Sequence, residues 1–237
     1  MRTFVLIAGS WHGAWCWQKI VPLLEAQGHR VRTPDLPATG ADRSDPSEVT
    51  LESWACFVAA QVAAEPEPVI LVGHSRGGIV ISRAAELAPE RVRRLVYVSG
   101  YLLTTGSTLA EVARADSGSL VPPNMVPAAG GHTCNLRESV TREALFGQCT
   151  DKDHEFALSH MTPEPLKPLV TRVAVTDERF GRVPRAYVEC SQDRCNTLTA
   201  QRRMQAALPC DPVLTLDSDH SPFFSHPQPL AQWLGQL

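Results

Sequence analysis

The sequence predicts an α/β fold: a mostly parallel central sheet with helices on both faces and an inserted, mainly helical cap. Short branched apolar runs alternate with segments of helical spacing, and no hairpin signal joins one run to the next. Parallel neighbours need crossover connections, so this alternation favours a parallel sheet. This alternation of strand and helix patterns is interrupted between residues 104 and 184, a segment that begins with a stretch rich in Pro, Gly and Ser. We therefore expect a core of residues 1–103 and 185–237 and a cap subdomain over residues 104–184.

The first half of the chain supplies most of the predicted core. Residues 3–9 form a short apolar run that predicts a strand, and residues 17–28 have helical spacing with Gly28 as the C-terminal stop. The elements expected next are a proline-broken strand at 29–37, a helix at 51–64, a fully buried strand at 68–73, a helix from Arg76 onward, and a strand at 91–103.

The second half completes the same pattern. A structureless insertion of this length would be unusual, so we expect the cap to contain its own helices, with short ones at 140–150 and 151–161. The sheet is then expected to resume, with a strand at 185–191, a helix at 197–208, a strand at 211–217 and a closing helix at 229–237.

Composition excludes several classes of partner. The net charge is -3, with 43% hydrophobic and 20% charged residues, so neither nucleic acid nor an anionic membrane is expected to bind. No apolar run approaches the roughly 20 residues that span a bilayer. The N-terminal apolar run is too brief for a signal peptide. Seven cysteines without a CxxC pair predict free thiols in a reducing cytoplasm and no metal site, although Cys190 and Cys195, which flank Asp193, could line a pocket instead of packing.

The stretch VILVGHSRGG, residues 69–78, contains a Gly-x-Ser-x-Gly motif where a buried strand becomes a helix. Gly73 and Gly77 remove side chains that would clash in a tight turn, and such a turn would expose the Ser75 hydroxyl. It would also leave the first N–H groups of the helix free to bind an anion. We therefore predict that Ser75 is a nucleophile and not merely a serine in a turn.

A serine nucleophile needs a base and a carboxylate that orients the base. In this class of fold the order along the chain is Ser, acid, His. His220 follows a late predicted strand, and Asp193 lies just past the end of another, at the edge where sites in parallel sheets assemble. Asp217 and Asp219 are close to His220 in sequence and are expected to be turn residues, whereas a surface ion pair is the alternative for Asp193.

The oxyanion hole is expected to use two backbone N–H groups. One belongs to Arg76, directly after the nucleophile, and the other to Ser10, in the loop after the first strand. Because each such donor contributes substantially to catalysis, the direction of that loop's backbone matters as much as any side chain.

These residues, with the opening FVLIAGSWHGAWCWQKIVPLLEAQGHRV and the tail DSDHSPFFSHPQPL, resemble the α/β-hydrolase superfamily. The sequence is most similar to the branch of plant methyl esterases, hydroxynitrile lyases and their bacterial esterase relatives. The resemblance implies an α/β-hydrolase fold and a cofactor-free enzyme with a small helical cap over an apolar pocket.

Departures from that branch refine the expectation. Lyases of the branch carry a threonine and a lysine where this chain has Gly9 and Ser221, so ester hydrolysis is favoured. Hydrolases commonly have His-Gly at Ala8-Gly9, which leaves the geometry of the oxyanion loop open. Arg76 replaces a Leu, Met or Gln, and its side chain is expected either to form a salt bridge outside the pocket or to bind a substrate carboxylate.

The resulting hypothesis is a serine carboxylester hydrolase that acts on a small apolar or aromatic ester through an acyl-enzyme. Trp11, Phe223 and the stretches 120–126 and 156–161 are the expected substrate contacts. Cyanohydrin cleavage of the lyase type, acyl transfer and a non-catalytic ligand receptor are the alternatives, and a homodimer is left open.

Overall fold

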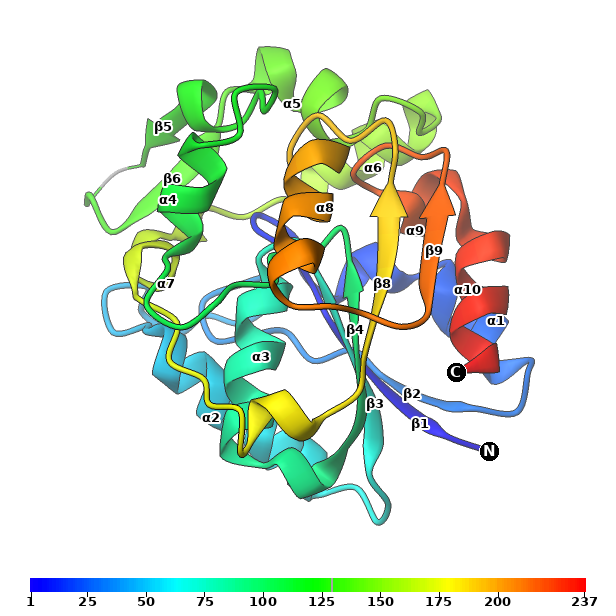
Figure 1. The fold of residues 1–237 in the computed structure, drawn as a ribbon. Helices are drawn as coiled ribbons and strands as arrows, with labels where there is room; N and C mark the ends of the chain where they lie inside the picture. Colours follow the sequence, from blue (N-terminus) through cyan, green and yellow to red (C-terminus); the bar gives the residue numbers. More distant parts are fainter. Residues whose placement is uncertain (129) are drawn as a thin grey trace.

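The computed structural model describes residues 1–128 and 130–237; Ala129, which falls in the predicted cap, lies outside the described residues. A six-stranded sheet in the order β2-β1-β3-β4-β8-β9 forms the centre of the molecule (Figure 1). Every neighbouring pair in it is parallel, which confirms the predicted sheet. Its strands are β1 (Thr3–Ile7), β2 (Arg30–Arg32), β3 (Val69–His74), β4 (Val92–Val98), β8 (Arg185–Cys190) and β9 (Val213–Leu216).

Helices cover both faces of this sheet. Figure 1 shows α1 (Ile20–Glu25) beside α10 (Pro227–Gln236) on one side, and α2 (Leu51–Ala63) beside α3 (Gly77–Leu87) on the other. Successive side chains of a strand point to opposite faces. The β1 residues Phe4 and Leu6 accordingly pack in the cluster that contains Leu234 of α10, whereas Val5 and Ile7 pack in the cluster that contains Trp54 of α2. Outside the segment between β4 and β8, the remaining elements are η1 (Ala14–Trp17), η2 (Pro89–Arg91), α8 (Leu198–Ala207) and α9 (Pro222–Ser225); η4 (Phe180–Arg182) lies at the end of that segment, just before β8.

Several predicted boundaries are wrong. The helix predicted over residues 17–28 is an α-helix only over α1, and η1 ends at Trp17 before it. Pro22 lies in the first turn of α1, where its missing N–H leaves no helical bond unmade. The strand predicted over residues 91–103 ends at Val98, because Ser99 has a φ of 41° and turns the chain out of the sheet.

The segment between β4 and β8 contains helices and a small second sheet. In Figure 1, α4, α5 and α6 lie at the end of the main sheet to which the arrows of β8 and β9 point. The two predicted helices are present as α5 and α6, with shifted ends. The antiparallel sheet β5-β6-β7 was not predicted, because strands of two to four residues are too short to show a period. The elements are α4 (Leu109–Arg114), η3 (Pro122–Asn124), β5 (Met125–Pro127), β6 (Thr133–Leu136), α5 (Glu138–Leu145), α6 (Asp151–His160), β7 (Glu164–Pro165) and α7 (Leu166–Val170).

Two further expectations concern the chain as a whole. All seven cysteines, each within the described residues, are free thiols. Within residues 1–128 and 130–237, no helix has both the length and the apolar character that a bilayer crossing requires.

Candidate active site

Ser75 lies in a tight turn between β3 and α3. Its φ of 50° is in the left-handed region, which is costly for a residue with a side chain. The turn requires glycine on both sides: a Cβ on Gly73 would lie 2.7 Å from the carbonyl oxygen of Gly77, and one on Gly77 would lie 2.8 Å from that of Ile7. The sequence therefore folds here into the geometry of a nucleophile elbow.

His220 and Asp193 meet beyond the carboxyl ends of β9 and β8. The His220 Nδ1 and Asp193 Oδ2 atoms are 2.6 Å apart, and the two side chains are 2% and 0% exposed. The contact fixes the tautomer: Nδ1 carries the proton that it donates to the carboxylate, which leaves Nε2 free to accept one.

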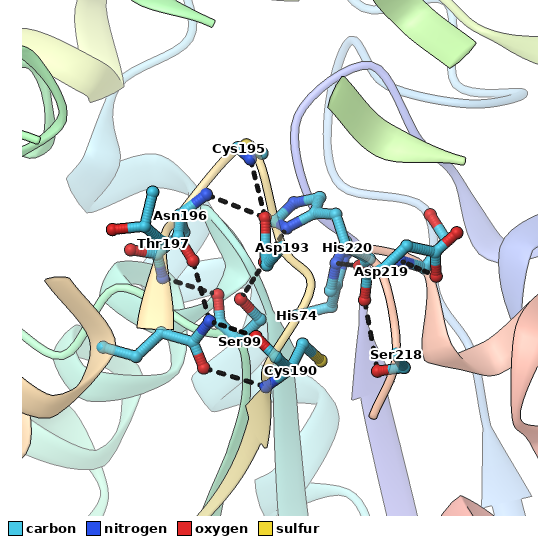
Figure 2. A network of polar contacts seen from close by, with 12 residues as sticks. His74, Ser99, Cys190, Asp193, Cys195, Asn196, Thr197, Ser218, Asp219 and His220 are labelled. Carbon is cyan, nitrogen blue, oxygen red and sulfur yellow. Dashed lines mark hydrogen bonds and ion pairs between the residues drawn. The ribbon is translucent and has the colours of Figure 1, made fainter. Parts of the chain in front are cut away.

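Asp193 is itself held on several sides. Its Oδ1 accepts the backbone N–H groups of Cys195 at 2.7 Å and Asn196 at 2.9 Å, and its Oδ2 accepts the Ser99 hydroxyl. Figure 2 shows the Asp193 carboxylate between the His220 ring and the loop that carries Cys195 and Asn196. The surface ion pair considered for Asp193 is therefore excluded, because the side chain is buried and all these partners are internal.

The charge of Asp193 also tunes the imidazole. Burial disfavours the imidazolium, but the contacts with Asp193 and Cys195 together outweigh it and raise the pKa of His220 well above its ordinary value of 6.5. A raised pKa makes the ring a stronger proton acceptor.

The His74 side chain contacts both the backbone and the ring of His220. Burial lowers the pKa of His74 well below its ordinary value, so this ring stays neutral. Its Nε2–H donates to the backbone oxygen of His220 at 2.8 Å, and the two ring centroids are 4.6 Å apart. His74 therefore fixes the position of the loop that carries His220.

A cavity of about 130 Å³ lies beside these residues. Ser75, which is 4% exposed, and Cys195 both line it. The Cys195 Sγ lies within 4.8 Å of the ligand atoms of His220 and Asp193. The structure thus brings the three predicted catalytic residues to one edge of the sheet: Ser75 lines the cavity, and the His220–Asp193 pair lies next to Cys195, which also lines it.

Two backbone N–H groups are available to an anion at this edge. Neither the Ser10 nor the Arg76 N–H group makes a hydrogen bond to any residue that the structure describes. Ser10 also lines the cavity. These are the two groups that the sequence predicts for the oxyanion hole.

Apart from Ser10, Ser75 and Cys195, the cavity wall is mostly apolar. It comes from residues 101–125 and from α7, with one charged side chain among the described residues that line it. That wall consists of Tyr101, Leu109, Ala110, Ala113, Arg114, Val121, Pro122, Met125, Leu166, Leu169 and Val170, and Trp11 completes the lining.

The predicted substrate contacts are only partly correct. Trp11 and the stretch 120–126 contribute to the cavity. Phe223 does not: it is fully buried and its ring packs edge-on against His74, with centroids 4.9 Å apart. No residue of the stretch 156–161 lines this cavity either. Phe156 of α6 packs against Trp15 instead.

The Arg76 side chain faces the protein interior. Its Nε lies 2.9 Å from Glu164 Oε1, and both side chains are 1% exposed. Of the two interpretations of Arg76, the salt bridge outside the pocket therefore agrees with the structure, and recognition of a substrate carboxylate does not.

Asp193, Cys195 and His220 are also the one group of metal-ligand type found among the described residues. Both Asp193 oxygens already accept hydrogen bonds, and one of them binds His220 itself. Burial raises the pKa of the Cys195 thiol, which disfavours the thiolate that a metal would need. The chemistry of the set favours proton transfer over metal binding.

Sequence reasoning missed Glu164, Tyr101 and the lining residues of α4 and α7. These residues reach the site through contacts between distant segments, and no local motif marks them. The unusual Arg76 was the one available signal for a buried carboxylate such as Glu164.

Comparisons with known proteins agree with this architecture. A family model described as "Alpha/beta hydrolase family" matches residues 4–233. Methylesterase 2 of Arabidopsis thaliana is 31% identical over 98% of this chain and 94% of its own length. The chain spans 63%, 72% and 56% of the length of three chloroplastic members of the same plant's methylesterase series.

Solved structures are also similar. The methylesterase MES16 from Arabidopsis has a TM-score of 0.88 at 23% identity, covering 100% of this chain and 98% of its own. A pyrethroid hydrolase from Sphingobium faniae JZ-2 has a TM-score of 0.84 at 28% identity, covering 99% of this chain and 96% of its own. The first of these similarities concerns the fold alone.

Proposed function

Because the chain belongs to the alpha/beta hydrolase family, we propose that it is a serine carboxylesterase acting on small esters with an apolar or aromatic part. The observation that carries the proposal is the His220 imidazole, oriented by Asp193 at 2.6 Å and close to Cys195, which lines the same cavity as Ser75. The methylesterase and pyrethroid hydrolase among its relatives support the choice of an ester bond.

The reaction would proceed through an acyl-enzyme. The Ser75 Oγ attacks the ester carbonyl while His220 Nε2 takes its proton, and the Asp193 carboxylate stabilises the imidazolium. The Ser10 and Arg76 N–H groups donate to the oxyanion. His220 then returns the proton to the leaving alcohol, and water, activated by the same ring, releases the acid.

The cavity supports a small substrate. Its volume of about 130 Å³ is close to that of an engineered apolar cavity of about 150 Å³ that binds benzene. Most of its wall comes from residues 101–125 and α7. We therefore propose that residues 104–184 act as the cap of the enzyme and choose the substrate by apolar contact.

Position 9 supports hydrolysis over lyase chemistry. A Cβ on Gly9 would lie 2.7 Å from His74 Nδ1 and 2.8 Å from Ser75 Cβ. The threonine of the related lyases therefore has no room here without movement of the nucleophile. Ser221 is fully buried, so the lysine of those lyases would place a charged ammonium in the interior at that position.

Turnover tests the proposal directly. The purified protein should hydrolyse p-nitrophenyl acetate and small methyl esters of aromatic acids, with release of one methanol per acid formed from the latter. Cyanide release from mandelonitrile without ester turnover would replace the proposal with the lyase. Products with an added alcohol or amine that exceed the hydrolysis product would replace it with acyl transfer. Failure of a fluorophosphonate to label the folded protein would favour a receptor.

The pH dependence of turnover follows from the pKa of His220. The ring acts as a base only when it is neutral, so kcat/KM should rise with pH and level off above the pKa of His220. Because that pKa is raised, the midpoint of the rise should lie above 6.5. A pH profile between 5 and 9 measures it, and a midpoint well below 6.5 would contradict the role assigned to the Asp193 charge.

A further inference from the structure

Arg76 and Glu164 form a buried ion pair directly behind the proposed oxyanion hole. Arg76 Nε donates to Glu164 Oε1 at 2.9 Å and Nη2 donates to Oε2 at 3.4 Å. The guanidinium also stacks over the Trp54 ring, 4.3 Å from its centroid. With both side chains 1% exposed, the guanidinium has a fixed direction.

The pair binds the oxyanion loop at two points. Arg76 Nη2 donates to the backbone oxygen of Gly9 at 2.9 Å, and Glu164 Oε2 accepts the backbone N–H of Trp11 at 3.1 Å. Trp11 has a φ of 61°, a left-handed conformation that a tryptophan adopts only where its surroundings impose it.

These two bonds, together with the His12 N–H that donates to the same Gly9 oxygen at 3.3 Å, hold the peptide group that carries the Ser10 N–H. The Gly9 oxygen and the Ser10 N–H belong to one planar trans peptide group, so they point in opposite directions. A donor that holds the Gly9 oxygen on the Arg76 side therefore turns the Ser10 N–H the other way. Because Glu164 takes the Trp11 N–H, Ser10 supplies the free donor of the loop.

We propose that the Arg76 and Glu164 side chains are positioning residues for the oxyanion hole. Arg76 then has two roles: its backbone N–H is one oxyanion donor, and its guanidinium orients the other. Glu164 lies in β7, within the segment inserted between β4 and β8, so the hole is complete only when that segment is docked. This inference rests on the proposed esterase function and deepens it.

The competing interpretation is an ion pair that only stabilises the fold. Burying two charges costs desolvation, and an apolar pair of similar volume would often serve stability as well or better. An apolar pair could not orient the Gly9 peptide group. The two interpretations therefore differ in what happens to kcat per active enzyme molecule.

The main test is the double variant Arg76→Met, Glu164→Gln, which leaves no unpaired buried charge and keeps an oxygen that can accept the Trp11 N–H. The second is Arg76→Lys, whose point charge lacks the fork that reaches Gly9 and Glu164 together.

Glu86→Gln is the matched control: Glu86 is also a buried carboxylate, but it binds Thr176 and Phe180, away from the loop. Active enzyme is counted by exhaustive fluorophosphonate labelling and intact mass.

With p-nitrophenyl acetate, both Arg76 variants should lose about 10- to 100-fold in kcat per labelled site, with KM changed less than about threefold. Binding of a trifluoromethyl ketone, which forms an oxyanion, should weaken by the same factor as kcat/KM. The midpoint of the pH profile should stay that of the wild type, because the His220–Asp193 contact is untouched. Glu86→Gln should keep the wild-type kcat.

Wild-type kcat per labelled site in both Arg76 variants would overturn the positioning role, even if their melting temperatures fell. A shifted pH midpoint would also overturn it, since the effect would then pass through His220. A wild-type enzyme that hydrolyses no ester would instead be a failure of the proposed function itself.

Discussion

Substitution of Ser75 by alanine is expected to lower kcat for p-nitrophenyl acetate by about 10⁶-fold, the loss found when the nucleophile of a serine protease is removed. The reason is that the hydroxyl forms the bond to the acyl group, and alanine has no nucleophilic atom in its place. Burial raises the pKa of the Cys195 thiol, so the neighbouring sulfur stays protonated and unreactive at neutral pH.

Stopped-flow and long-time assays of the purified variant measure this loss, with circular dichroism to verify the fold. Ser82→Ala is the matched control: this serine is also buried and lies in α3, where it bonds Tyr97 and Gly78, away from the cavity. Its loss should lower the melting temperature and leave kcat unchanged. Turnover by Ser75→Ala within 100-fold of the wild type would exclude the serine as nucleophile.

Substitution of Asp193 by asparagine is expected to lower kcat by about 10⁴-fold, as the same change does in a serine protease triad. The asparagine amide can donate a hydrogen bond to His220 Nδ1, which places the ring proton on Nε2, the nitrogen that must accept the serine proton. The change also removes the charge that raises the pKa of His220, so burial then lowers that pKa and the residual activity should rise at a lower pH.

The control for this variant is Asp217→Asn. Asp217 is exposed and binds Ser191 and Gln192, so its amide should leave both kcat and the pH profile as they are. A kcat for Asp193→Asn within tenfold of the wild type, or an unshifted pH midpoint, would contradict the orientation of His220 by this carboxylate.

The three catalytic candidates were predictable because each follows a strand of a parallel sheet, either directly or within a short loop. The carboxyl ends of such strands meet at one edge, so Ser75 after β3, Asp193 after β8 and His220 after β9 were expected to converge. The class of fold adds the order of these residues along the chain. The Gly-x-Ser-x-Gly motif and the strand pattern therefore predicted the catalytic candidates, which composition alone could not do.

Residues that depend on packing between distant segments were not predictable in the same way. Phe223 follows His220 closely and was expected in the pocket, but the turn into α9 directs its ring against His74. Glu164 lies 88 positions from Arg76, in a two-residue strand with no pattern of its own. Such contacts are fixed by how the inserted segment docks, which local periodicity does not encode.

The boundaries of several elements show the same limit. The stretch of residues 91–103 was expected to form one strand, yet the sheet ends at Val98, and the chain turns at Ser99, where φ is 41°. The backbone N–H of Tyr101 there donates to the carbonyl oxygen of Ser75 at 3.0 Å. The turn at Ser99 therefore shortens the strand and places Tyr101 where its backbone supports the turn that carries Ser75.

The central claim is that Ser75 becomes acylated during turnover. Rapid acid quenching of the enzyme with p-nitrophenyl acetate, followed by proteolysis and mass spectrometry, tests it most directly. We expect one acetyl group on Ser75, formed at the rate of the first release of p-nitrophenol and absent from Ser75→Ala. An acetyl group on Cys195 in its place, or complete turnover with no covalent adduct at any quench time, would contradict it.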